Sequence, residues 1–124
     1  MPHCTLEFSS NVMDCPDLRK LFSELHDVLA STGLFDREAI KSRAIRHDDY
    51  LIGDGDRHRA FVALDVSILS GRPDDAKARI TDDALELLKH HFAESIAEQT
   101  CNITVKVSEI HRSSYRRFAS ATGA

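Results

Sequence analysis

The chain has 124 residues, which is enough for one domain with a single buried core. Charged residues make up 29% and hydrophobic residues 42% of the sequence, and 16 basic against 20 acidic residues give a net charge of −4. This mild acidity argues against non-specific binding to nucleic acids or anionic membranes, which requires concentrated Lys and Arg. No apolar run approaches the ~20 residues of a membrane span, and the first twenty residues contain no apolar signal-peptide core.

The three cysteines, Cys4, Cys15 and Cys101, are odd in number and widely spaced. This pattern is typical of neither a disulfide framework nor a zinc site. We therefore expect a reduced, cytoplasmic protein with no bound metal.

The first half of the chain predicts a strand, a helix and a second strand. Hydrophobic and polar residues alternate over residues 2–8, which indicates a half-buried strand. Pro16 suits the first helical position, and Asp17 would add negative charge to the first turn. An amphipathic helix that ends near Gly33 follows from the three-and-four spacing of its apolar residues: Leu18, Leu21, Phe22, Leu25, Val28 and Leu29. Residues 40–47 form a short predicted strand with Lys41 and Arg43 on one face.

The second half repeats this order. Residues 60–69 alternate clearly and predict a strand, and Pro73 in the following loop predicts a helix start. A single long helix over residues 74–99 is expected from one apolar stripe: Ile80, Ala84, Leu87, Leu88, Phe92 and Ile96. Residues 102–109 predict the last strand, and the tail 111–124 shows no period.

Two strand–helix–strand halves, about 2–47 and 60–110, each fit a right-handed β-α-β crossover. We expect one domain over residues 1–124, an α/β sandwich with a four-stranded sheet and both helices on one face. The other face of the sheet would be polar but mixed, so that solvent or a neighbouring subunit would cover it: Thr5, Glu7, Asp65, Ser67, Thr104 and Lys106.

Pro2 is the first candidate for chemistry. A methionine before proline is normally removed, which would leave a free prolyl amine at the start of a strand. An α-amino group titrates at ~7.7–8.0, and burial or nearby arginines lower that pKa. The neutral amine would then be able to move a proton between two carbons. Met-Pro starts are common, however, and the dipeptide alone does not indicate catalysis.

Three cations are candidates for binding carboxylates. Arg72 lies between a strand end and a helix start, where free backbone N–H groups and the helix dipole favour anions. Its guanidinium would be able to clamp a carboxylate through two hydrogen bonds. Lys41 and Arg43 share a strand face and would grip a second carboxylate. A solvated loop arginine and a charged strand edge are the alternative interpretations.

Other groupings do not support a site. His90 and His91 are neighbours on a helix and point about 100° apart, so they cannot chelate one ion. Residues 49–56 lack the ligand spacing of a calcium loop. The tail is basic and aromatic, which favours contact with a neighbouring subunit or an acidic partner over nucleic-acid binding: Arg112, Tyr115, Arg116, Arg117 and Phe118.

Several short segments, in their order and spacing, resemble one known family: Pro2-His3, Ser31-Thr32-Gly33-Leu34-Phe35, Ile40-Lys41-Ser42-Arg43, Asp54-Gly55, Ala60-Phe61-Val62, Gly71-Arg72, Leu87-Leu88-Lys89-His90-His91-Phe92 and Glu109-Ile110-His111. The family is that of the 5-carboxymethyl-2-hydroxymuconate isomerases. It lies in the tautomerase superfamily with 4-oxalocrotonate tautomerase and macrophage migration inhibitory factor, and the resemblance covers nearly the whole chain.

The resemblance implies a duplicated β-α-β fold, a homotrimer, and an isomerase that uses neither metal nor organic cofactor. The reaction would move a proton between carbons of an unsaturated enol polycarboxylate in homoprotocatechuate breakdown, downstream of 4-hydroxyphenylacetate. By position, Pro2 would be the acid and base, and Arg72 the principal binder of a carboxylate or dienolate. Lys41 and Arg43 match an expected Arg-Ser-Arg motif in which lysine replaces the first arginine and loses its bidentate geometry.

Two alternatives stay open at this level. One is a non-catalytic trimeric binding protein on the same scaffold, because a fold does not fix a function. The other is a tautomerase for a different enol acid, such as a phenylpyruvate-type enol.

Overall fold

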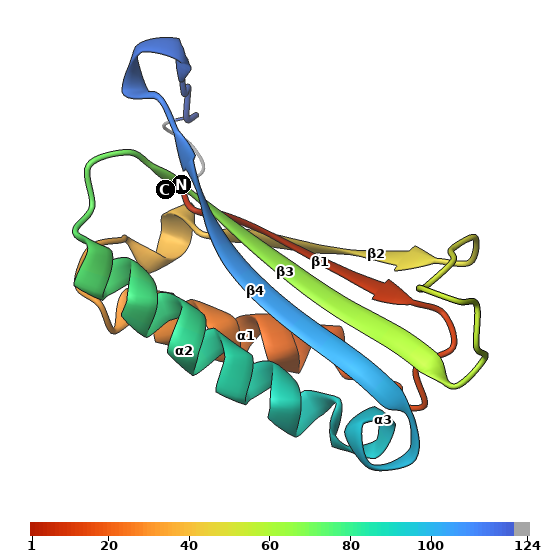
Figure 1. Ribbon diagram of the computed structural model, residues 1–124. Coiled ribbons are helices and arrows are strands. Elements are labelled where there is room, and N and C mark those ends of the chain that lie inside the picture. Colours follow the sequence, from red (N-terminus) through yellow and green to blue (C-terminus); the bar gives the residue numbers. More distant parts are fainter. Residues whose placement is uncertain (121–124) are drawn as a thin grey trace.

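The computed structural model describes residues 1–120, so the last four residues of the predicted tail lie outside the described part. The helices are α1 (Leu18–Ala30), α2 (Asp74–His91) and α3 (Ala93–Glu98). The strands are β1 (His3–Ser9), β2 (Lys41–His47), β3 (Arg59–Leu69) and β4 (Thr100–Ile110). Two 3₁₀ turns, η1 (Arg37–Ala39) and η2 (Arg112–Ser114), precede β2 and follow β4. Figure 1 shows these elements in two layers, with the sheet above the helices.

The four strands form one sheet in the order β2-β1-β3-β4. β1 and β2 are parallel, as are β3 and β4, so each half of the chain is a β-α-β unit. The halves join through antiparallel pairing of β1 with β3 at the centre of the sheet. This arrangement, with α1 and α2 on the same face (Figure 1), confirms the predicted fold class.

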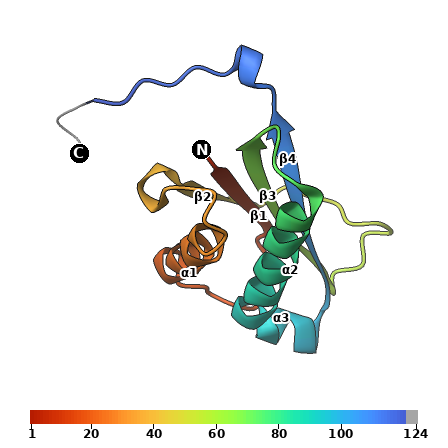
Figure 2. The same ribbon diagram turned by 90° about the vertical axis from the view of Figure 1, so that its left-hand side faces the viewer.

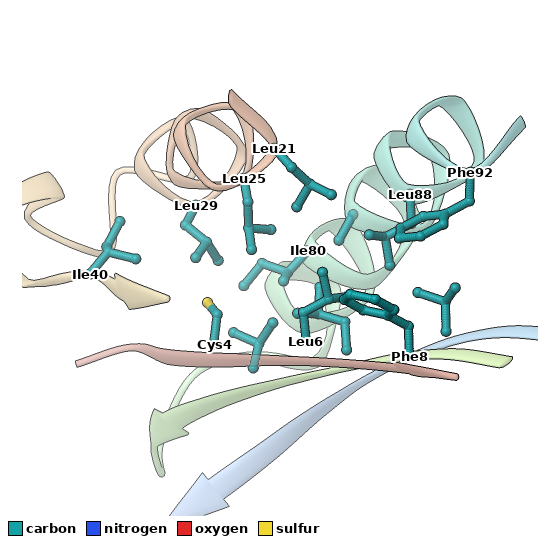
Figure 3. Close-up of a cluster of buried hydrophobic side chains, with 14 of the residues drawn as sticks. Cys4, Leu6, Phe8, Leu21, Leu25, Leu29, Ile40, Ile80, Leu88 and Phe92 are labelled. Carbon is teal, nitrogen blue, oxygen red and sulfur yellow. The ribbon is translucent and has the colours of Figure 1, made fainter. Parts of the chain in front are cut away.

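The core lies between this face of the sheet and the two long helices. Side chains from β1 point toward the helices, and α1 and α2 each turn an apolar stripe toward the sheet (Figure 3). The fully buried members include Cys4 and Leu6 from β1, Leu21, Leu25 and Leu29 from α1, and Ile80, Leu88 and Phe92 from α2 and its C-terminal end. Alternation in the strands and three-and-four spacing in the helices thus meet in one apolar layer, as the sequence predicts.

The predicted long helix over residues 74–99 is wrong in one respect, because the chain breaks it at Phe92. Phe92 leaves helical geometry (φ −113°, ψ 29°) and its ring packs 6.1 Å from the ring of Phe8. The carboxylate of Asp14 accepts hydrogen bonds from the backbone N–H of Ser95 (3.0 Å) and the Ser95 hydroxyl (2.7 Å), which fixes a new helix start. The turn takes Ile96 out of the apolar stripe and leaves it 42% exposed.

The start of α1 also differs from the prediction by two residues. Asp17 is the residue before the helix rather than part of its first turn, and Pro16 lies outside it. The Asp17 carboxylate accepts a hydrogen bond from the backbone N–H of Lys20 at 3.2 Å. Asp17 therefore acts as an N-cap, which satisfies one of the free N–H groups at the helix start.

The face of the sheet away from the helices is polar and internally hydrogen bonded. Asp65 accepts hydrogen bonds from the hydroxyls of Ser67 (2.8 Å) and Ser108, and Glu7 pairs with His47 at 2.8 Å. We call this surface the open face. Among residues 1–120, no helix is both long and apolar enough to cross a membrane.

The break at Phe92 leads to a test of stability. We expect Phe92→Ala to lower the free energy of unfolding by about 3–5 kcal/mol, because a fully buried aromatic ring is lost from the core. Ile96→Ala, at a position predicted as core but found exposed, should change it by less than about 0.5 kcal/mol. Urea unfolding at one fixed protein concentration measures both. An equal loss of free energy of unfolding in the two variants would contradict the break at Phe92, because Ile96 would then be as buried as Phe92.

Candidate active site

The central pairing brings the sequence-predicted site residues to one end of the sheet. His3 of β1 lies opposite Ser67 of β3 in the antiparallel pair, so Pro2 lies beside the end of β3 and the loop that leads to α2. β2 runs parallel to β1 and begins at the same end, with Lys41 opposite His3. Figure 1 shows the N-terminus at this end, beside the start of β2.

Pro2 is fully buried, although it lies beyond the first strand residue. Strand alternation places it on the same side as Cys4, toward the helices. Its carbonyl accepts a hydrogen bond from the backbone N–H of Lys41 at 3.1 Å, which fixes the chain end to β2. Met1 is half-buried and also contacts the segment before β2, because its amino group donates to the carbonyl of Ala39 at 3.4 Å.

The end of the sheet is electrostatically positive. Burial lowers the pKa of the Met1 amino group, and the charges of Lys41 and Arg117 lower it further. The pKa of His3 is lowered by burial and then by the guanidinium of Arg43. Such surroundings disfavour the protonated form of any base and attract anions.

Arg72 is held on the helix side of the same end. Its side chain is half-buried, with the guanidinium carbon 5.4 Å from the centre of the Phe35 ring. One terminal nitrogen donates to the carbonyl of Leu34 at 3.4 Å, while the buried Nε has no partner within residues 1–120. The preceding Gly71 has φ +107°, a left-handed conformation that glycine favours, and this turn directs the chain from β3 toward α2. Arg72 is thus positioned by packing and retains donors for an anion.

Lys41 and Arg43 lie on the edge strand β2 and face the opposite side of the sheet from Pro2. The Nζ of Lys41 donates to the carbonyl of Ala39 at 2.9 Å. Arg43 donates to Nδ1 of His3 at 2.9 Å. The structure therefore groups Pro2 with Arg72 on the helix side and Lys41 with Arg43 on the open face, so the two pairs approach each other only at the end of the sheet.

A hollow of about 770 Å³ opens at this end, between the start of the sheet and the tail. His3, Glu38 and Lys41 line one wall, and residues 115–120 line the other. The chain after β4 turns back over the N-terminus in Figure 2. The sequence revealed the basic and aromatic character of this tail, but no periodicity placed it beside its own N-terminus. Phe35 and Glu38 were not predicted from the sequence as site residues. Phe35 packs against the guanidinium of Arg72, and Glu38 lies in the 3₁₀ turn η1. Neither contact follows from a regular spacing in the sequence.

The remaining reactive groups do not join this site. Burial raises the pKa of the Cys4 thiol to about 11, so it stays protonated near neutral pH. Within residues 1–120, no three His, Cys, Asp or Glu side chains are grouped as metal ligands. What the end of the sheet offers is one buried nitrogen position, at Pro2, with Arg72 on the helix side and Lys41 and Arg43 on the open face.

Known proteins match this chain along nearly its whole length. A family model described as 5-carboxymethyl-2-hydroxymuconate isomerase matches residues 2–120. The 5-carboxymethyl-2-hydroxymuconate Delta-isomerase of Escherichia coli is 31% identical over 111 residues, which cover 90% of this chain and 88% of that protein.

Solved structures agree with these matches. A 5-carboxymethyl-2-hydroxymuconate isomerase from Deinococcus radiodurans R1 superposes with a TM-score of 0.88 at 28% identity, over 96% of this chain and 90% of its own. A fused 4-OT wild-type symmetric trimer shares the fold alone, with a TM-score of 0.71 at 12% identity, over 96% of this chain and 91% of its own. The chain belongs to the 5-carboxymethyl-2-hydroxymuconate isomerase family and is, with that family, an isomerase.

Proposed function

We propose that this enzyme isomerises 5-carboxymethyl-2-hydroxymuconate and that the amine of Pro2, exposed by removal of Met1, is its acid and base. The observation that carries the proposal is the full burial of Pro2 next to an amino group whose pKa is lowered by burial, Lys41 and Arg117. Family membership supports the substrate. On the resemblance seen in the sequence, we further propose that the reaction belongs to homoprotocatechuate breakdown.

The environment of the chain end supports a neutral amine. The Met1 amino group already has a lowered pKa, caused by burial and by Lys41 and Arg117. Without Met1, the amine would lie one residue deeper, where the side chain is fully buried. Its protonated form would be further disfavoured, so the unprotonated amine would be present near pH 7.

The proposed reaction is a proton transfer in two steps. In the keto form of the substrate, the Pro2 amine takes a proton from the carbon next to the carbonyl, and the electron pair of that C–H bond delocalises into a dienolate. The protonated amine then returns the proton to a different carbon of the same conjugated system. No atom is gained or lost, and the double bond changes position.

Arg72 is proposed to stabilise the charge that develops on the dienolate oxygen. Phe35 and Leu34 hold the guanidinium in place before substrate arrives, so little reorganisation is needed. The N-terminus of α2 begins two residues later and adds backbone N–H groups to the same region. Arg43 and Lys41 are proposed to bind a carboxylate at the open-face side of the site.

We further propose that the protein works as a homotrimer. The open face is polar, hydrogen bonded and not covered by helices, and β2 and β4 leave free edges on the sheet. Closed symmetric assembly is the usual way to cover such surfaces. The structural neighbour described as a symmetric trimer supports this arrangement.

Blocking the proline amine should abolish activity. A variant with one extra alanine between Met1 and Pro2 turns the proline nitrogen into an amide without a basic lone pair. We expect its turnover to fall at least about 10²-fold below that of the processed enzyme, the usual contribution of general acid–base catalysis. Intact mass establishes the state of each N-terminus, and circular dichroism checks the fold. Equal turnover in the two forms would remove Pro2 from the mechanism.

Arg72 and Arg43 should contribute differently to catalysis. Arg72→Ala is expected to lower kcat by about 10²–10³-fold, because it removes a preorganised donor from the developing oxyanion. Arg43→Ala should cost less, since Arg43 lies on the exposed edge strand and faces the other side of the sheet. Steady-state kinetics of both variants decide the order. A wild-type kcat/KM in Arg72→Ala would contradict the role of Arg72.

The proposed homotrimer can be tested by measuring the mass of the protein in solution. Light scattering at low micromolar concentration should give about three times the 13.9 kDa of one chain. Ser67→Arg, which places a charge on the open face, should lower that mass, whereas Ala78→Arg on the exposed side of α2 should not. A fully active 13.9 kDa monomer would contradict the trimer.

A further inference from the structure

Three cations gather around the hollow at the end of the sheet without a carboxylate partner. Several basic side chains elsewhere do pair with acids: Arg37 with Asp27, Arg59 with Asp54, Lys77 with Glu109 and Lys89 with Glu86. Within residues 1–120, Lys41, Arg43 and Arg117 form no ion pair, although Glu38 lines the same hollow. Positive charge left unpaired around a hollow is suited to an anionic ligand.

The tail that carries Arg117 is fixed in place rather than free. After β4, the Nε of Arg112 donates to the carbonyl of Ser70 at 2.9 Å, which ties the tail to the end of β3. The 3₁₀ turn η2 follows, with the backbone N–H of Ser114 bonded to the carbonyl of His111 at 3.1 Å. These contacts direct the next residues back over the N-terminus, where they form one wall of the hollow (Figure 2).

The two neighbouring arginines of the tail have different roles. Arg116 turns its guanidinium back to its own segment, donating to the carbonyls of Ser113 (3.1 Å) and Tyr115 (2.9 Å). Arg117 makes no hydrogen bond within residues 1–120, yet its charge is close enough to lower the pKa of the Met1 amino group. Of the two, Arg117 is the one whose guanidinium is available to a ligand beside the chain end.

The proposed substrate requires more than one cationic group. A muconate has two carboxylates, and the carboxymethyl branch adds a third. The proposed function assigns Arg72 to the dienolate oxygen, and Arg43 with Lys41 to one carboxylate. The other carboxylates therefore need further donors. Hydrogen bonds between a guanidinium and a carboxylate are charge-assisted and about twice as strong as neutral ones.

We propose that Arg117, on the wall of the hollow opposite Lys41, binds a further carboxylate of the substrate and so makes the enzyme selective for polycarboxylates over monocarboxylates. This assignment rests on the proposed function. Arg117 binds a part of the substrate remote from the reacting carbons, equally in ground and transition states. Its loss therefore raises KM and leaves kcat nearly unchanged.

Kinetics of Arg117→Gln test the proposal. With 5-carboxymethyl-2-hydroxymuconate, we expect kcat/KM to fall about ten- to hundredfold, the loss of one hydrogen bond between charged groups, with kcat within about twofold of wild type. With phenylpyruvate enol, a monocarboxylate, the same variant should match the wild type. An equal loss of kcat/KM on both substrates, or no loss on either, would overturn the assignment of Arg117.

Two matched variants distinguish a direct contact between Arg117 and the carboxylate from a general effect of net positive charge. Arg116→Gln removes the same charge one residue away and should change KM for 5-carboxymethyl-2-hydroxymuconate by less than about threefold, because its guanidinium is bonded to the tail itself. Arg57→Gln removes an exposed charge from the connection between β2 and β3, at the opposite end of the sheet, and should have no effect. An Arg116→Gln enzyme as impaired as Arg117→Gln would show that only net charge matters.

A binding experiment keeps this inference distinct from the proposed function. Calorimetry with propane-1,2,3-tricarboxylate, which cannot be isomerised, should show at least about tenfold weaker binding to Arg117→Gln than to wild type. That result in an enzyme without isomerase activity would support the carboxylate site while rejecting the proposed reaction. Normal isomerase activity with unchanged tricarboxylate binding in the variant would reject Arg117 alone. A wild type that does not bind the tricarboxylate would also reject it.

Discussion

The antiparallel pairing of β1 with β3 is the contact on which the rest of this structure depends. Each β-α-β half is a parallel unit, and among the described strands only this central pair joins the two halves into one sheet. Because the two strands run in opposite directions, the first residues of the chain lie beside the last residues of β3. The same pairing therefore completes the apolar layer and places Pro2 near the loop that carries Arg72.

The fold was predictable because its signals are local and periodic. Alternation in β1 and β3 and the three-and-four spacing in α1 each specify an element and its buried face without reference to the rest of the chain. The failure at Phe92 has a different origin. The apolar stripe continues to Ile96, but the carboxylate of Asp14, from a distant loop, binds Ser95 in the first turn of a new helix that begins at Ala93. A hydrogen bond across about eighty positions has no signature in a local pattern.

The candidate site was predictable in its members but not in its geometry. Single residues at the ends of strands, Pro2 and Arg72, can be found from the order of elements, since strand ends are fixed by the pattern. That Lys41 and Arg43 face away from Pro2 follows only from the register of β2 against β1. The cation–π contact of Arg72 with Phe35 and the return of the tail over the N-terminus depend on tertiary packing that spacing does not encode.

The N-terminus and the tail up to Ser120 meet at one end of the sheet, which has a practical consequence for anyone who handles this protein. His3 and residues 115–120 line the same hollow, so an affinity tag or fused domain at the N-terminus would be placed beside the reacting groups. The connection between β2 and β3 lies at the opposite end of the molecule (Figure 1), and its exposed residues Asp54 and Asp56 bracket a glycine turn. Labels, surface anchors and fluorescent reporters therefore belong in that connection.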